Sequence, residues 1–203
     1  MASSVLIQFA HPALEKSRVN RHLIQAVRDL PGVFFNDLYE NYPDFQIDVR
    51  HEQELLRRHS TIIFMHPFYW YSGPSIIKEW MDLVLEHGFA YGHTGKELEG
   101  KRMMNAVTAA GAHDAYRPEG YNKFTVRHLL SPFEQTANLC GMKYLAPFVV
   151  HGSLSMHTIA EVMPYVRLYR SIVQALVNDT VDLERAAKAE NLNTILFSET
   201  SFS

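Results

Sequence analysis

The feature of this 203-residue sequence that most constrains its fold is a regular alternation of short apolar runs with amphipathic segments. The runs Val5–Phe9 and Thr61–Met65 are almost continuously apolar, which is typical of strands buried on both faces. After the first run, apolar residues recur at helical spacing from Val19 to Leu30, and Pro31-Gly32 then stops the helix. The chain therefore reads as alternating strands and helices.

The alternation continues along the whole chain. We expect strands at Val5–Phe9, Val33–Leu38, Thr61–Met65, Met103–Val107 and Pro147–Val150, and helices after Ser17, over Val49–Arg58, after Pro74, over Arg127–Met142 and over Ile159–Val177. In the helix after Pro74, one face is expected to carry Ile76, Ile77, Trp80, Leu83 and Val84. Strands joined by helical crossovers pair in parallel. The prediction is an α/β three-layer sandwich whose five-stranded parallel sheet has the order 2-1-3-4-5, with helices on both faces.

Composition indicates one globular domain over residues 1–203, because 47% of the residues are hydrophobic and 20% are charged. We expect residues 179–203 to be a peripheral segment in which Leu192–Phe197 docks on the domain or on a partner subunit. A net charge of -3 and a pI near 6.4 provide no basic stripe for DNA or RNA and argue against a nucleic-acid partner.

Cysteine content and the N-terminus bear on the compartment. Cys140 is the only cysteine, so no internal disulfide forms, and its apolar helical surroundings predict a core residue rather than a catalytic thiol. The sequence has no basic leader before Val5–Ile7 and no apolar stretch of bilayer length. We therefore expect a cytoplasmic protein.

Ligands of an open parallel sheet bind beyond the carboxyl ends of the strands. Four segments occupy those ends: His11–Asn20, His66–Gly73, Thr108–Tyr121 and His151–His157. The first leads into a helix N-terminus, where free N–H groups and the helix dipole favour an anion, and Ser17 and Asn20 add polar side chains. Because neither GxGxxG nor GxxxxGK[ST] occurs, we expect a single phosphate there. The alternative is that Ser17 only caps the helix.

The second segment contains four consecutive aromatic residues, Phe68-Tyr69-Trp70-Tyr71. A surface loop cannot bury four rings in the main core, so the loop predicts a wall for a planar conjugated ligand, held rigid by Pro67 and Pro74. A subunit interface is the alternative, and one loop can serve both purposes.

The third segment begins with small residues, Thr108-Ala109-Ala110-Gly111, which let backbone N–H groups approach the edge of a bound ring. The hydroxyls of Tyr116 and Tyr121 follow, and they can donate where negative charge develops. The eleven histidines show neither H-x-x-x-H nor H-x-H spacing, and no G-x-S-x-G elbow occurs. We predict neither a metal site nor an esterase nucleophile.

Motifs spread over most of the chain carry a family resemblance: Ala10-His11-Pro12 with Ser17-x-x-Asn20, Asp37-Leu38-Tyr39, Tyr42-Pro43-Asp44-Phe45, His66-Pro67 with Trp70-Tyr71-Ser72, and Leu85-x-x-Gly88-Phe89-Ala90-Tyr91-Gly92. Together they resemble the flavodoxin-like NAD(P)H:quinone oxidoreductases. The resemblance is greatest to the short bacterial branch that includes the ancillary proteins of glutathione-regulated potassium-efflux systems.

The resemblance implies a flavodoxin-like fold that binds FMN in preference to FAD. The implied contacts are His11, Ser17, Arg18, Val19 and Asn20 for the phosphate and ribityl chain, Pro67, Phe68, Tyr69, Trp70 and Tyr71 for the ring, and Thr108, Ala109, Ala110, Gly111 and Tyr116 for its polar edge. It also implies a homodimer with the flavin at the subunit boundary. The implied reaction is ping-pong: hydride passes from the co-substrate NAD(P)H to flavin N5, and two electrons then pass to a quinone-like acceptor.

Two departures from the family pattern concern catalysis. The family's Thr-Thr-Gly-Gly after the fourth strand is replaced by Thr108-Ala109-Ala110-Gly111, which keeps the backbone donors. In larger relatives a Tyr and a His assist hydride transfer; Tyr116 matches the Tyr, whereas the region of the His reads Gly120-Tyr121-Asn122. Tyr116 and Tyr121 are therefore the expected catalytic residues, with Tyr121 in place of the His.

Three alternatives keep the same flavin site. An open planar pocket also suits azo or nitro compounds as acceptors. A regulatory role is the second, in which the chain docks on a potassium-efflux transporter at the inner membrane. The third is a one-electron flavodoxin carrier, against which the mild net charge of -3 over 203 residues argues.

Overall fold

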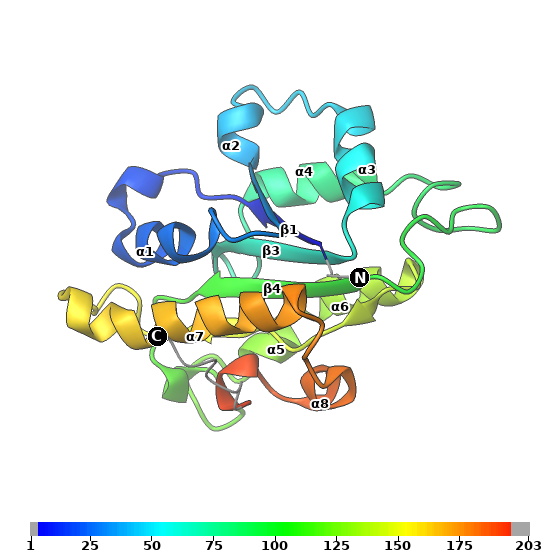
Figure 1. Cartoon of the computed structure of the whole chain (residues 1–203). Coiled ribbons are helices and arrows are strands. Elements are labelled where there is room, and N and C mark those ends of the chain that lie inside the picture. The colour runs from blue at the N-terminus through cyan, green and yellow to red at the C-terminus, as the bar shows by residue number, and fades with distance from the viewer. Residues whose placement is uncertain (1–3, 196–203) are drawn as a thin grey trace.

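The computed structural model describes residues 4–195, in which one parallel sheet lies between two layers of helices (Figure 1). The strands are β1 (Val5–Phe9), β2 (Val33–Asp37), β3 (Thr61–Pro67), β4 (Arg102–Thr108), β5 (Lys143–Tyr144) and β6 (Phe148–Val150). The α-helices are α1 (Arg18–Val27), α2 (Leu38–Asn41), α3 (Val49–Arg58), α4 (Ser75–Val84), α5 (Val126–Leu129), α6 (Ser131–Leu139), α7 (Ile159–Val177) and α8 (Leu183–Lys188). The short 3₁₀ turns are η1 (Leu14–Lys16), η2 (His113–Ala115) and η3 (Leu192–Thr194).

The sheet confirms the predicted parallel order, which is β2-β1-β3-β4-β5, with β6 also paired to β4. The expected fifth strand consists of two pieces: β5 pairs with the start of β4 and β6 pairs with its end. Pro147, which has no N–H, lies between the pieces, and the Ala146 N–H donates to the carbonyl of Ala186 in α8 instead (2.9 Å). The sixth strand is thus a small addition to the predicted topology.

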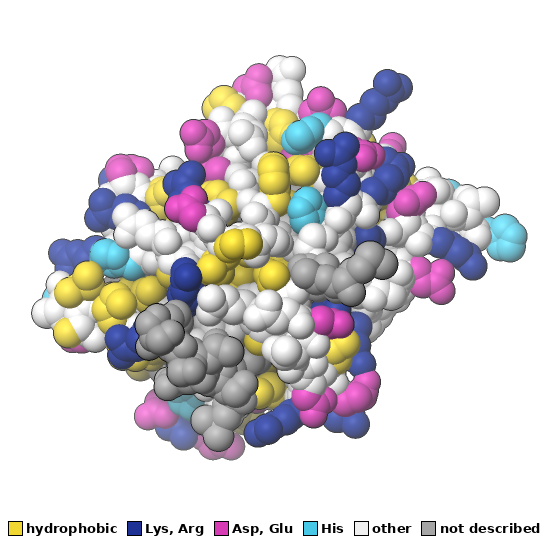
Figure 2. Space-filling model, in the orientation of Figure 1, with side chains coloured by type: hydrophobic (Ala, Val, Ile, Leu, Met, Phe, Trp, Pro, Cys, Tyr) yellow, Lys and Arg dark blue, Asp and Glu magenta, His cyan; other side chains and the backbone are white. Residues whose placement is uncertain are grey.

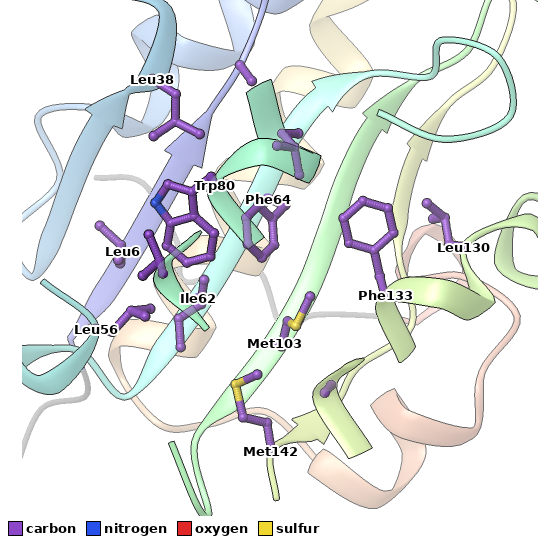
Figure 3. Packing of buried hydrophobic residues seen from close by; sticks show 14 of the residues in the cluster. Leu6, Leu38, Leu56, Ile62, Phe64, Trp80, Met103, Leu130, Phe133 and Met142 are labelled. Atoms are coloured by element: carbon purple, nitrogen blue, oxygen red, sulfur yellow. The ribbon is translucent and has the colours of Figure 1, made fainter. Parts of the chain in front are cut away.

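Side chains alternate between the two sheet faces and form two cores. On β1, Leu6 packs with α3, α4 and α6, whereas Ile7 packs with α1 and α7. Figure 3 shows the first core around Trp80 and Phe64, whose rings meet edge to face with centroids 5.4 Å apart. One predicted member of this face is wrong, because Leu83 on α4 is 39% exposed.

Local sequence signals explain most helix boundaries. Thr158 and Glu161 form a capping box that begins α7 at the predicted residue. The single helix expected over Arg127–Met142 is wrong, since α5 and α6 are separate. Pro132 lies in the first turn of α6 and has no N–H to donate to the carbonyl of His128 four residues earlier, so the hydrogen bonds of α5 do not continue into α6.

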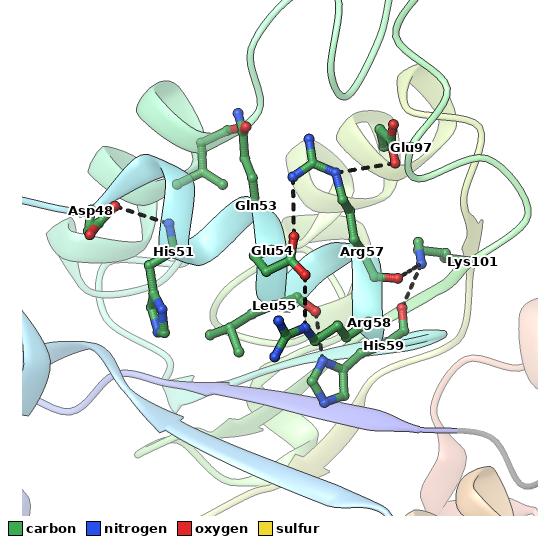
Figure 4. A network of polar contacts seen from close by, with 11 residues as sticks. Asp48, His51, Gln53, Glu54, Leu55, Arg57, Arg58, His59, Glu97 and Lys101 are labelled. Atoms are coloured by element: carbon green, nitrogen blue, oxygen red, sulfur yellow. Dashed lines mark hydrogen bonds and ion pairs between the residues drawn. The ribbon is translucent and has the colours of Figure 1, made fainter.

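The long connection between α4 and β4 extends away from the sheet but is tied to the end of α3 (Figures 1 and 4). Arg57 pairs with Glu97 (3.5 Å), and its guanidinium lies over the ring of Phe89 (5.0 Å). The ammonium of Lys101 donates to the carbonyls of Arg57 (3.1 Å) and His59 (2.8 Å). A cation at the carbonyl end of a helix is favourable, so these contacts fix the returning chain.

The segment after α7 covers the β6 edge of the sheet. The N–H of Leu192 donates to the Pro147 carbonyl (2.9 Å), and the Asn193 side-chain amide pairs with both the N–H and the carbonyl of Val149 (2.9 and 2.8 Å). Asn193 thus replaces a neighbouring strand for one residue. Residues 196–197 of the segment that we expected to dock lie outside the described residues. Within residues 4–195, no helix is long and apolar enough to cross a membrane.

Candidate functional site

The segments after β1, β3, β4 and β6 meet at the carboxyl edge of the sheet and enclose a cavity of about 420 Å³. It is lined by His11, Ala13, Lys16, Ser17, Arg18, Val19, Asn20, Pro67, Phe68, Tyr69, Thr108, Ala110, Ser153, Leu154, Met156 and His157. The volume is that of a site for an organic ligand. All four strand-end segments predicted from the sequence therefore meet in one cavity.

The N-terminus of α1 forms one end of the cavity. The Ser17 hydroxyl caps the helix by accepting the Asn20 N–H (3.2 Å), and it also accepts the Asn20 side-chain amide (3.0 Å). That amide donates to the Thr108 hydroxyl as well (3.0 Å), which ties the helix to the end of β4. Asn20 is 2% exposed, and its Oδ1 has no partner among the described residues. Ser17 is thus a helix cap, and the helix end that it caps faces the cavity.

Polar and charged groups surround this end. The Nδ1 of His11 accepts the Ala13 N–H (3.1 Å), so the neutral ring carries its proton on Nε2. Burial lowers the pKa of His11, which favours that neutral form. Lys16 and Arg18 line the same end, and Arg18 also donates to the carbonyl of His157 (3.3 Å). Two cations and a helix N-terminus make an environment for an anion.

The aromatic loop contains a tight turn with unusual backbone geometry. The Ser72 N–H donates to the Tyr69 carbonyl (2.9 Å), and the two residues between them, Trp70 and Tyr71, have φ values of 50° and 63°. Two successive positive φ angles are normally supplied by Asn or Gly, so bulky side chains here are strained. Among the described residues, the N–H groups of Trp70 and Tyr71 have no acceptor. Phe68 is buried, whereas Trp70 is 93% exposed.

The loop after β4 contributes only part of its predicted set. Thr108 and Ala110 line the cavity, but Ala109 is fully buried and its N–H donates to the Val150 carbonyl (2.8 Å). The Gly111 carbonyl accepts the Gly152 N–H (2.9 Å). The structure therefore joins the β4 and β6 loops through their backbones and turns Ala109 away from the cavity.

The two predicted catalytic tyrosines lie in different surroundings. Tyr116 packs between Phe68 and His151, with ring centroids 5.8 and 5.5 Å away, so it adjoins the cavity wall without lining the cavity. A Cβ on Gly111 would lie 3.0 Å from its ring, which explains the glycine. Burial, and next Tyr71, raise the pKa of Tyr116. Tyr121, by contrast, is 87% exposed.

The segment after β6 supplies wall residues that the sequence did not single out: Ser153, Leu154, Met156 and His157. They lie in a stretch recognised as a strand end, but they carry no aromatic run or glycine motif. Figure 2 shows hydrophobic side chains gathered at this end of the molecule with Lys and Arg side chains beside them. Leu154 is 76% exposed, so position beyond a strand end was the one available signal.

Comparison with known proteins identifies the family. Residues 3–171 match the family described as the flavodoxin-like fold. The chain belongs to this family. It is also 46% identical over 147 residues to the glutathione-regulated potassium-efflux system ancillary protein KefG of Pectobacterium carotovorum subsp. carotovorum (strain PC1), covering 72% of this chain and 80% of that protein. The KefG of Cronobacter sakazakii is 41% identical over 167 residues, which are 82% of this chain and 90% of the relative.

Solved structures of similar chains carry different names. The general stress protein 14 of Treponema denticola, solved in complex with FMN, has a TM-score of 0.79 and 36% identity, covering 85% of this chain and 99% of that one. An NADPH-quinone reductase from P. pentosaceus has a TM-score of 0.75 and 32% identity, covering 83% and 96%. A structure described as a thermophilic tryptophan halogenase has a TM-score of 0.80 and 40% identity, covering 83% and 97%. Because the names differ, a function has to be argued from the site.

Proposed function

We propose that this protein is an FMN-dependent NAD(P)H:quinone oxidoreductase. The observation that carries the proposal is the cavity, which has an anion-binding helix end and an aromatic wall within about 420 Å³. A single phosphate joined to a planar ring system has these two requirements. The FMN complex of the Treponema denticola protein and the quinone-reductase name of the P. pentosaceus protein support the assignment.

The residues present fit FMN. At the phosphate and ribityl end, the Nε2–H of His11 and the first-turn N–H groups of α1 are donors, while the orphaned Oδ1 of Asn20 is an acceptor for a hydroxyl. At the ring end, the free N–H groups of Trp70 and Tyr71 are donors for a polar ring edge. Each open hydrogen-bonding group therefore has a counterpart in the mononucleotide.

FMN would supply the redox chemistry here, a two-electron transfer between NAD(P)H and a quinone-like acceptor. The chain's own residues bind and orient. Tyrosine keeps its hydroxyl proton at neutral pH, and burial raises the pKa of Tyr116 further, so its hydroxyl can donate toward developing charge. Phe68 and Tyr69 supply the aromatic side chains of the cavity wall beside it.

An absorbance spectrum of the purified protein tests the proposal. We expect a flavin spectrum, or its recovery on adding FMN, which bleaches anaerobically with NADH or NADPH and returns when a quinone is added. A colourless protein that FMN cannot reconstitute contradicts the proposal. If azo or nitro compounds restore the spectrum faster than quinones do, the acceptor is wrong while the flavin site stands.

Exposed aromatic residues around the site support a homodimer. Trp70, Tyr71, Tyr121 and Phe124 are 93%, 47%, 87% and 46% exposed, which is much apolar surface for the rim of a site. In the proposal a second copy covers this surface and the bound ring. Light scattering should give twice the 23.3 kDa mass of one chain, and a monomer at micromolar concentration contradicts it.

A second candidate function follows from the relatives' names. Both KefG proteins are named as ancillary to a glutathione-regulated potassium-efflux system, so this chain is also a candidate partner of such a transporter at the inner membrane. Copurification with the transporter, and potassium efflux measured with and without this chain, test that role. A chain that neither copurifies nor changes efflux is a stand-alone enzyme.

A further inference from the structure

Three buried side chains form a chain of hydrogen bonds beneath the aromatic loop. The Tyr144 hydroxyl donates to Asn105 Oδ1 (2.7 Å), the Asn105 amide donates to His66 Nε2 (3.1 Å), and His66 Nδ1 donates to the Pro67 carbonyl (2.9 Å). The Pro67 carbonyl can only accept, so it fixes the direction of every bond in the chain. His66 and Asn105 are fully buried.

His66 touches both ends of the loop. It bonds to Pro67 at the start, whose carbonyl also accepts the Tyr69 N–H (3.0 Å). At the other end, a Cβ on Gly73 would lie 3.3 Å from the His66 ring, so Gly73 packs directly on it. The opposite support is Phe133, which stacks on His66 with centroids 5.7 Å apart. One rigid imidazole therefore joins the two ends of the segment.

Between these ends lies the strained turn at Trp70 and Tyr71. A non-glycine residue in the left-handed region is strained and persists only where its surroundings hold it. The same two residues carry N–H groups that have no acceptor among the described residues, and they follow Phe68 and Tyr69, which line the cavity. Without the contacts of His66 to Pro67 and Gly73, this turn would relax and lose its positive φ angles.

We propose that His66 is a positioning residue that holds the aromatic loop in the strained form that receives the planar ring. The proposal rests on the proposed function for the identity of the ring, but the effect of His66 on the loop can be measured without any flavin. His66 does not touch the ring itself; it acts through Pro67 and Gly73.

The two tryptophans allow a direct test. Trp70 is exposed at the turn and Trp80 is 1% exposed in the core, so a Trp80→Phe background leaves Trp70 as the sole reporter. In that background, His66→Phe keeps an aromatic ring but removes both hydrogen bonds. Tyr42→Phe is the matched control, because it removes a buried hydrogen bond to Glu52 (2.8 Å) away from the loop.

We expect His66→Phe to lower the fluorescence anisotropy of Trp70 in the flavin-free protein and to weaken FMN binding about tenfold or more. Tyr42→Phe should lower the melting temperature but change neither property. His66→Gln, which keeps a donor and an acceptor, should restore much of the anisotropy. The proposal is overturned if His66→Phe folds and keeps both the anisotropy and the FMN affinity within twofold. If the parent protein itself binds no FMN, the proposed function fails, while the anisotropy still tests whether His66 holds the aromatic loop.

The unmutated protein gives a second test, which holds even if His66→Phe does not fold. Nitrogen-15 NMR of histidine-labelled protein should show His66 as the Nδ1–H tautomer, because Nδ1 must donate to Pro67. An Nε2–H tautomer at this residue overturns the proposal, since the Pro67 bond would then be absent.

Discussion

Two polar regions of this molecule lie on the same sheet and are built in opposite ways. In the first, the buried carboxylate of Glu52 accepts hydrogen bonds from Gln8 (2.7 Å), Asn36 (2.9 and 3.1 Å), Tyr42 (2.8 Å) and Trp80 (2.8 Å). In the second, the cavity at the strand ends leaves Asn20 Oδ1 without a partner among the described residues, and the turn beside it leaves the N–H groups of Trp70 and Tyr71 without one.

The difference separates structure from function in physical terms. A buried polar group without a partner is unfavourable by about 1–3 kcal/mol, and the Glu52 cluster avoids this because its carboxylate accepts from four side chains packed around it. Groups left open at a cavity have a free energy to gain from a ligand. On this comparison, the Glu52 cluster stabilises the fold, and the cavity is the region suited to the proposed cofactor.

The largest expected effect is the loss of the Glu52 carboxylate. Glu52→Ala leaves several buried donors without an acceptor, so we expect the free energy of unfolding to fall by about 3–5 kcal/mol in urea titrations. The folded fraction should bind FMN with unchanged affinity. Glu54→Ala on the same helix is the control, because Glu54 is half-exposed and its ion pairs with Arg57 and Arg58 contribute little. If both variants unfold at the same urea concentration, the cluster is not the stabilising element.

The sequence predicted the open region better than the closed one. The strand ends, the aromatic loop and Ser17 can be recognised in the sequence by position and residue type, and the structure brings all three to one cavity. Nothing in the amphipathic pattern of Val49–Arg58 marks Glu52 as buried, because its four partner side chains come from separate segments. Burial of a charged residue is a tertiary property that helical periodicity does not encode.

The same reasoning explains the smaller differences at the site. Ala109 belongs to the predicted loop, but its N–H is taken by Val150, and sequence alone cannot locate the strand that pairs there. The helix expected over Arg127–Met142 breaks because Pro132 lacks the N–H that would continue the helical hydrogen bonds, which outweighs apolar periodicity. Local signals thus predicted the elements, while pairing partners required the fold.

The second expected effect is a pH dependence of the free energy of unfolding, caused by His66 beneath the aromatic loop. Burial lowers the pKa of His66 from 6.5 to about 4. The folded ring therefore stays neutral between these pH values, while the unfolded chain takes up a proton near pH 6.5. The unfolded state binds more protons between these pH values. The free energy of unfolding contributed by neutral His66 is therefore fully present above pH 6.5, and it falls by about 3 kcal/mol in all as the pH drops toward 4.

Urea titrations from pH 7 to 4 should show this fall, and His66→Gln should flatten it. The curve keeps some slope, because the pKa values of His11, His59 and His151 are lowered as well. Tyr42→Phe should lower the whole curve without changing its slope, since the pKa of Tyr42 is raised far above this range. Parallel curves for His66→Gln and the unmutated protein would show that His66 is not the titrating group.

The smallest expected effect lies in the open region itself and separates the two predicted catalytic tyrosines. Tyr116 is packed against Phe68 and His151 beside the cavity, whereas Tyr121 is 87% exposed. In stopped-flow reduction by NAD(P)H, we expect Tyr116→Phe to slow hydride transfer about tenfold, which is about 1.4 kcal/mol of barrier. Neither variant should change the free energy of unfolding by much, because phenylalanine keeps the ring.

Tyr121→Phe is the matched control within one chain, and it should leave the rate unchanged. If Tyr121→Phe slows reduction and Tyr116→Phe does not, the exposed tyrosine reaches the reacting groups across a subunit boundary. That result would transfer the catalytic hydroxyl to a second copy and make the dimer necessary for activity. Equal rates in all three proteins would instead leave the site with binding and orientation alone.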